Sequence, residues 1–130
     1  MNRKVKLYVD IINSINLIEE FLGPINLFQQ YTIDFKTKSA IERQLGIIGE
    51  AVKKIKDIET KEKEHKQQNY TNQEEDSESE TPMPYQNEII GLRNKLIHGY
   101  DAINDFTIWS VLKDHINPLK EWVSDKLTTE

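Results

Sequence analysis

Apolar residues recur at intervals of three and four positions along most of this chain, which is the period of a helix with one buried face. The clearest example is the segment 7–22, where polar residues fill the opposite side. Its apolar residues are Leu7, Tyr8, Ile11, Ile12, Ile15, Ile18 and Leu22. Gly23 and Pro24 follow directly, and such a pair ends a helix because glycine caps its carboxyl end and proline cannot continue its hydrogen bonds. The pattern predicts an all-α fold.

Further helices follow from the same period. A short one is expected over 24–31, beginning at the proline. A long third helix is expected after a cap at Thr32 or Asp34, with an apolar stripe that reaches Ile55. A fourth runs from Pro84 toward Gly99, and its apolar residues indicate burial along much of its length.

A last helix is capped by Asp101 or Asn104 and extends to Trp122. Since Pro118 removes a ladder hydrogen bond and crowds the preceding turn, a kink or break is expected over 114–117. His115 in that segment is interpreted as a partly exposed polar residue. The whole prediction is a single domain over residues 1–130, an antiparallel bundle of four to five helices, which this length suffices to give a core.

Two glycines, Gly46 and Gly49, fall inside the predicted third helix, where each costs about 1 kcal/mol in helix propensity. The close approach of another helix best explains small residues at these positions. Glu50 follows them and has two interpretations. It lines a cleft or holds a partner's arginine, or it faces solvent as most glutamates do, and residue-type statistics favour the second.

The stretch 59–82 has one aromatic residue and no aliphatic one, so it cannot bury enough surface to offset the entropy of ordering. We expect helix up to about Lys66 and then a long, disordered acidic loop. Of the 17 basic and 22 acidic residues of the chain, this stretch holds three and eight, so the remainder carries 14 of each sign. The net charge of −5 is therefore local, and the body of the protein offers no broad basic surface to nucleic acid.

Four side chains able to act on a phosphate ester lie close together near the end of the fourth helix: Arg93, Asn94, His98 and Tyr100. Arginine offers a charged fork to phosphate oxygens, and histidine exchanges a proton near neutral pH. On an ideal helix Asn94 and His98 share a face, whereas Arg93 and His98 point about 140° apart. The length of the arginine, a left-handed Gly99 after the histidine, or dimerisation would bring the two together. The alternative is that both side chains merely complement the helix dipole.

This stretch resembles the signature of the HEPN superfamily, in the extended arginine-four-histidine-one-tyrosine form of HepT toxins. Two other segments resemble HepT-like chains, 40–51 and the tail from Tyr100 through Trp109 to Trp122. The resemblance covers most of the chain outside 59–82, which looks like an insertion. It implies a HEPN-like bundle that forms a homodimer with the motif at its interface.

The resemblance also implies a function: an endoribonuclease toxin that cleaves tRNA or mRNA. Arg93 and His98, assisted by Asn94, are then the catalytic residues. The implied partners are the RNA substrate and a minimal nucleotidyltransferase (MNT) antitoxin, which transfers AMP onto the tyrosine that corresponds to Tyr100, as in type VII toxin–antitoxin systems. No cofactor is expected.

Cleavage by the ribose 2′-hydroxyl needs no metal, and the sequence shows no paired-histidine metal motif, glycine-rich phosphate loop or nucleophile elbow. The chain has no cysteine and no apolar block typical of a signal peptide or a membrane span, so a cytoplasmic protein is expected. Two other functions remain open. One is a catalytically inactive nucleotide- or substrate-binding subunit that serves the nucleotidyltransferase, and the other is a helical interaction module.

Overall fold

The computed structural model describes residues 2–69, 81–99 and 103–129, and these form six helices and no strand. The helices are α1 (Arg3–Leu22), α2 (Phe28–Ile33), α3 (Phe35–Asn69), α4 (Gln86–His98), α5 (Asp105–Asp114) and α6 (Ile116–Thr129). The predicted all-α fold is confirmed. The break expected near Pro118 is also confirmed, and it separates α5 from α6 at His115.

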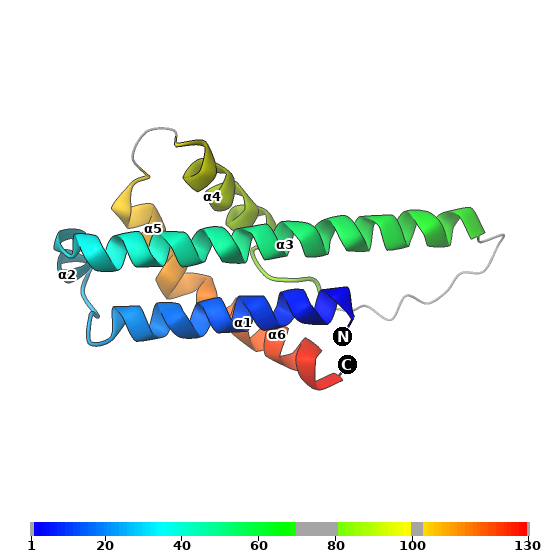
Figure 1. The fold of residues 1–130 in the computed structure, drawn as a ribbon, viewed down its shortest axis with the longest axis horizontal. Helices are drawn as coiled ribbons and strands as arrows, with labels where there is room; N and C mark the ends of the chain where they lie inside the picture. Colours follow the sequence, from blue (N-terminus) through cyan, green and yellow to red (C-terminus); the bar gives the residue numbers. More distant parts are fainter. Residues whose placement is uncertain (1, 70–80, 100–102, 130) are drawn as a thin grey trace.

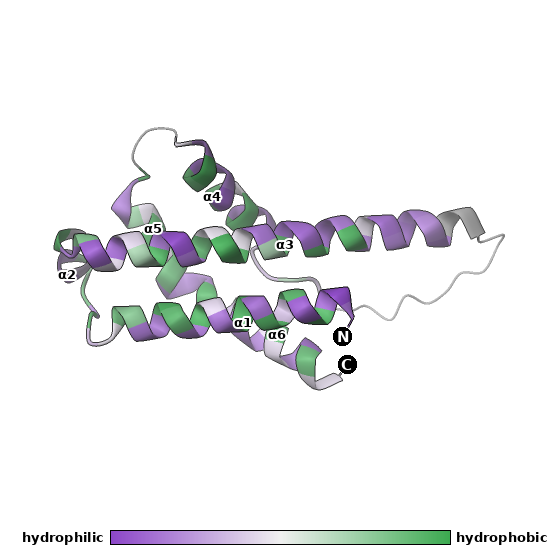
Figure 2. Cartoon of the chain, viewed as in Figure 1, coloured by the Kyte–Doolittle hydropathy of each residue, from purple (hydrophilic) through white to green (hydrophobic). Residues whose placement is uncertain are grey.

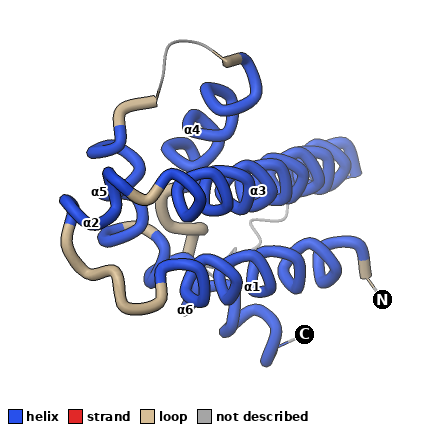
Figure 3. Tube along the Cα trace, turned by 60° about the vertical axis from the view of Figure 1, so that its left-hand side comes forward, coloured by secondary structure: helices blue, strands red, loops and turns tan. Residues whose placement is uncertain are grey.

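The long helices α1 and α3 lie antiparallel and side by side, with α4 packed on the far side of α3 and α6 packed against α1 (Figures 1 and 3). The short helix α2 caps the end of this pair beside α5 (Figure 3). Within the described part of the chain, no helix is both long and apolar enough to cross a membrane.

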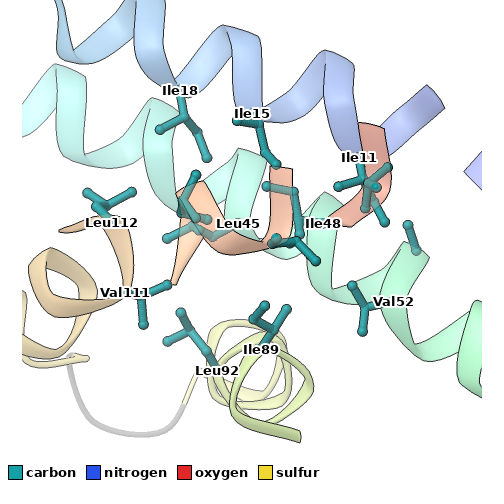
Figure 4. Packing of buried hydrophobic residues seen from close by; sticks show 14 of the residues in the cluster. Ile11, Ile15, Ile18, Leu45, Ile48, Val52, Ile89, Leu92, Val111 and Leu112 are labelled. Atoms are coloured by element: carbon teal, nitrogen blue, oxygen red, sulfur yellow. The ribbon is translucent and has the colours of Figure 1, made fainter. Parts of the chain in front are cut away.

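A single core fills the space between these helices. Its centre consists of isoleucine, leucine and valine side chains contributed by α1, α3, α4 and α5 (Figure 4). They include Ile11, Ile15, Ile18, Leu45, Ile48, Val52, Ile89, Leu92, Val111 and Leu112. The predicted apolar stripe of 7–22 is thus the buried face of α1, and Ile12 and Leu22 are only partly buried at its margin.

Two predicted helix starts differ from the structure. The second helix begins at Phe28 and not at Pro24, and α4 begins at Gln86, two residues after Pro84. Tyr85 occupies the cap of α4 with φ +60°, a conformation that costs a residue with a side chain about 1–2 kcal/mol. The caps at Asp34 and Asn104 are confirmed, because their side chains accept hydrogen bonds from the backbone N–H of Thr37 (3.1 Å) and Phe106 (2.7 Å).

Helix α3 runs well past the end of α1, and its far part is hydrophilic (Figure 2). It continues to Asn69, so residues 59–69 of the acidic stretch belong to it. Lys4 reaches Glu62 there at 3.1 Å. Residues 70–80, on which most of the predicted disordered loop falls, lie outside the described residues, and that part stays a prediction.

The junction of α2, α3 and α5 holds ionisable groups away from water. Lys38 Nζ lies 2.7 Å from the Asp105 carboxylate, with both side chains mostly buried, and this pair joins the start of α3 to the start of α5. Tyr31 is fully buried nearby, and burial raises the pKa of its phenol. Burial likewise raises the pKa of the Glu42 carboxyl, and the nearby Asp105 adds to the rise although Lys38 opposes it.

Candidate active site

The predicted motif lies on the last two turns of α4, where the helix leaves the bundle. Ile89 and Leu92 pack into the core, but Ile97 is 56% exposed and His98 is exposed as the last helical residue. The expectation that this helix is buried along much of its length is therefore wrong for its final turn, since only its first part packs against α3 (Figure 1). The predicted role of Gly99 is confirmed: it ends α4 in the left-handed conformation with φ +62°.

Arg93 is held from two sides. Its Nη2 donates to the Glu50 carboxylate on α3, and its Nη1 donates to the Asn94 Oδ1 at 2.9 Å. The Arg93 side chain is only 18% exposed, and its buried Nε has no hydrogen-bond partner among the described residues. Because a guanidinium has five N–H donors, these two contacts fix its plane and still leave donors for an anion.

Glu50 was interpreted as a solvent-facing residue, and the structure corrects this: it is half-exposed and pairs with the arginine of its own chain. Lys54 lies one turn further along α3, with its Nζ 3.9 Å from the other Glu50 oxygen. Glu50 thus lies between two cations and orients the one that belongs to the motif. Sequence reasoning missed the pair because the residues are 43 positions apart.

Gly49 explains how α4 comes so near. A Cβ at this position would overlap the Arg93 Cβ and lie 2.8 Å from its Cγ and 3.2 Å from the Ile89 carbonyl oxygen. The predicted close helix approach is therefore confirmed at Gly49. It is wrong at Gly46, where an added Cβ would meet nothing within 4 Å.

The structure brings together two of the four predicted site residues. Arg93 and Asn94 are brought together by their hydrogen bond. His98 follows five positions after Arg93, so the two side chains leave the helix in directions about 140° apart. Tyr100 lies outside the described residues, and its predicted role is unaffected by the structure.

A shallow depression of about 370 Å³ lies beside this site, between α1, α3 and the end of α4. Its lining includes the apolar side chains of Leu7, Ala51 and the more exposed Ile47 and Ile97. Charged residues also line it: Asp10, Arg43, Glu50 and Lys54. We call it the α1–α3–α4 depression. It thus includes the carboxylate that holds Arg93 and the apolar residue that precedes His98 in the sequence, Ile97.

Among residues 2–69, 81–99 and 103–129, no three histidine, aspartate or glutamate side chains gather in a way that could hold a metal ion. The polar groups assembled at the site are instead a guanidinium, an amide and a carboxylate, with an imidazole on the same helix end. These groups suit binding and proton transfer at a phosphodiester.

Comparison with known proteins gives the family. A family model described as "Ribonuclease HepT-like" matches residues 11–125, which contain α2, α3, α4 and α5 completely and the greater part of α1 and α6, and which include Glu50 and the motif on α4. The chain belongs to the HepT-like ribonuclease family. The resemblance inferred from the motif is thereby confirmed, and so is the HEPN-like helical fold.

Individual relatives cover almost all of this HepT-like chain. It is 35% identical over 121 residues to "Probable ribonuclease HepT" of Thermococcus cleftensis, which is 92% of this chain and 93% of the relative. It is 29% identical over 122 residues to "Putative RNase MJ1380" of Methanocaldococcus jannaschii, covering 93% and 94% of the two chains. No solved structure gives a significant match.

Proposed function

We propose that this protein is a metal-independent endoribonuclease, the toxin of a type VII-like toxin–antitoxin system, which cleaves tRNA or mRNA. Membership of the HepT-like ribonuclease family is the observation that carries the proposal. The geometry of α4 supports it, because the Arg93 guanidinium is fixed in place and an exposed His98 follows at the helix end.

The reaction follows from the chemistry of these groups. A base removes the proton from a ribose 2′-hydroxyl, the 2′-oxygen forms a bond to phosphorus, and the bond from phosphorus to the 5′-oxygen breaks. An acid returns a proton to that 5′-oxygen, so the products are a 2′,3′-cyclic phosphate and a 5′-hydroxyl. His98 serves as base or acid. Arg93 stabilises the added negative charge on the phosphorane-like transition state, and Asn94 orients the guanidinium by accepting its hydrogen bond.

The diverging directions of Arg93 and His98 favour a site that is shared between two chains. The α1–α3–α4 depression offers apolar surface for such a homodimer, and a second copy seated on Ile97 would lie next to His98 of the first. One chain would then supply Arg93 and the other His98 to the same phosphodiester.

Mixing two inactive variants tests this arrangement. Native protein should cut RNA in excess chelator, whereas His98→Ala and Arg93→Ala should each be inactive while keeping the helical circular dichroism spectrum of the native protein. Unfolded and refolded together in equal amounts, the two variants should recover about a quarter of the native activity, because half of the dimers are mixed and each has one intact site. Uncut RNA with the native protein would favour a nucleotide-binding subunit, and absence of recovery would contradict the shared site.

Regulation is part of the same proposal: an MNT nucleotidyltransferase antitoxin transfers AMP from ATP to Tyr100 and releases pyrophosphate. The phenol oxygen bonds to the α-phosphorus, and the added nucleotide brings negative charge within two residues of His98, where it repels RNA phosphates. Incubation with an antitoxin of this class and ATP should add the mass of AMP to the native chain and none to Tyr100→Phe. Modification of the phenylalanine variant would contradict the assignment.

A further inference from the structure

A second cavity lies between α4 and α5. We call it the α4–α5 groove; Glu88, Gly91 and Lys95 line one side, and Phe106, Ser110 and His115 line the other. Its volume is about 440 Å³, and the buried Leu92 and Val111 form its apolar floor. This size is within the range of sites that hold small organic ligands.

Aromatic rings stand along the α5 side of the groove. Phe106 is 62% exposed at the start of α5. At the other end of α5, the imidazole of His115 stacks on the ring of Tyr85, with centroids 4.0 Å apart and planes inclined by 20°. Tyr85 has a left-handed backbone conformation, and the buried Nδ1 of His115 has no hydrogen-bond partner in the described part of the chain. Planar rings beside an apolar floor are the features that bind unpaired bases.

The polar residues of the groove match a nucleotide in charge. Lys95 is an exposed cation one turn before His98 on the same helix, and lysine binds phosphate as a point charge. Glu88 lies two turns further back and offers a carboxylate, which accepts hydrogen bonds from an exocyclic amino group. The groove therefore has a cation that can bind phosphate, Lys95, at the end near His98 and a carboxylate that can accept from an amino group, Glu88, at the other end. Apolar surface lies between them.

Gly91 keeps the groove open. A Cβ built on it meets no atom within 4 Å, so a side chain there would enter the groove without disturbing either helix. The position is thus suited to fill the groove while the rest of the fold stays intact.

We propose that the α4–α5 groove is a subsite for one nucleotide of single-stranded RNA, adjoining the phosphodiester that His98 acts on. This inference rests on the proposed ribonuclease function and adds the part of the substrate that is bound and its preference. The base lies on the apolar floor among Phe106 and His115, and its phosphate faces Lys95. Bases with an exocyclic amino group, such as cytosine, bind better than uracil because that amino group donates to Glu88, whereas uracil has a carbonyl oxygen at the same ring position, which can only accept.

Nuclear magnetic resonance titration of the full chain with nucleoside 3′-monophosphates tests the site without catalysis. Cytidine 3′-monophosphate should shift the backbone amides of Gly91 and Ser110 and bind more tightly than uridine 3′-monophosphate. Gly91→Leu should weaken this binding at least about fivefold, the loss expected when a base loses one stacking site, with no fall in melting temperature. Gly91→Ala is the size control, since a methyl group fills little of the groove.

Charge variants separate the phosphate from the base. Lys95→Gln should weaken binding of cytidine 3′-monophosphate and leave binding of the nucleoside cytidine unchanged, whereas Lys6→Gln, the same change on the exposed face of α1, should affect neither. Unchanged nucleotide binding and unchanged KM for RNA in Gly91→Leu would overturn the subsite while leaving the ribonuclease proposal intact. Nucleotide binding in the groove of a native protein that cuts no RNA would support the subsite and overturn the proposed function. Shifts at Gly91 and Ser110 that depend on protein concentration alone would assign the groove to a second copy and overturn the proposal.

Discussion

Replacing Gly49 by alanine should separate helix propensity from helix packing at the point where α3 meets α4. The new methyl group would lie 2.8 Å from Arg93 Cγ and 3.2 Å from the Ile89 carbonyl oxygen, and it would overlap the Arg93 Cβ. Carbon atoms in contact stay about 3.5–4.0 Å apart, so relieving the overlap with the Arg93 Cβ would require α4 to move away by roughly 1.5 Å. Two of the three obstructing atoms, the Arg93 Cβ and the Ile89 carbonyl oxygen, cannot rotate aside because the backbone of α4 fixes their positions.

The magnitude follows from two opposing contributions. Alanine is favoured over glycine in a helix interior by about 1 kcal/mol, while overpacking of a close contact costs about 1–3 kcal/mol. Gly46→Ala on the same helix gains the first contribution and meets no atom within 4 Å, as does Gly91→Ala on α4. The free energy of unfolding of Gly49→Ala should therefore fall about 2 kcal/mol below that of these two controls, which is roughly 8 °C in melting temperature for a chain of this length.

Chemical denaturation of the three variants at one protein concentration measures the difference, and an RNA cleavage assay adds a second readout. Gly49→Ala should also lose activity, because α4 carries Arg93 away from Glu50. Equal stabilisation of all three variants would show that α3 and α4 do not approach each other as the structure has them, and the account of how Arg93 is held would then be wrong.

Two further perturbations follow from the structure. Glu50→Gln should lower kcat more than it raises KM, because Glu50 positions Arg93. Lys54→Gln removes the other cation beside Glu50 and serves as the control, which should stay nearly as active as the native protein. Equal effects of the two variants on kcat would contradict a positioning role for Glu50. Burial raises the pKa of the Glu42 carboxyl in the folded state above its ordinary 4.5, so ionisation of this group destabilises the fold as pH rises through the folded pKa. Glu42→Gln removes the ionisable group and should therefore raise the melting temperature at pH 7. Thermal melts should show the gain disappear below about pH 4.5, and a gain that persists in acid would point to a cause other than titration.

Much of the fold could be predicted because helical periodicity is a local property of the sequence. The stripes of α1 and α3, the cap at Asp34, the left-handed Gly99 and the break at His115 each depend on residues within a few positions of one another. The wrong starts of α2 and α4 are also informative. A proline permits a helix to begin but does not require it, and at Tyr85 the stacking on His115 accompanies a backbone conformation that propensity disfavours.

The candidate site likewise has residues that the sequence motif reveals and contacts that only the packing of the helices reveals. Arg93, Asn94 and His98 are selected by their resemblance to the HEPN signature, because spacing at a helix end is equally typical of side chains that complement the helix dipole. Their catalytic role stays a prediction. The contact of Glu50 with Arg93 depends on how α3 and α4 pack, and that information is distributed over Gly49, Ile89 and the core beneath them. An exposed Ile97 likewise follows from where α4 leaves the bundle, which its own apolar pattern does not reveal.

The Glu50 carboxylate that pairs with Arg93 affects how RNA would be selected. A phosphodiester that approaches the Arg93 guanidinium also approaches the Glu50 carboxylate, which is paired with it. Outside residues 59–82, the chain has equal numbers of basic and acidic residues. Bulk RNA should therefore gain little from long-range attraction, and complex formation should depend only weakly on ionic strength. RNA molecules whose shape fits the surface at short range should stay bound, whereas other RNA molecules should dissociate quickly.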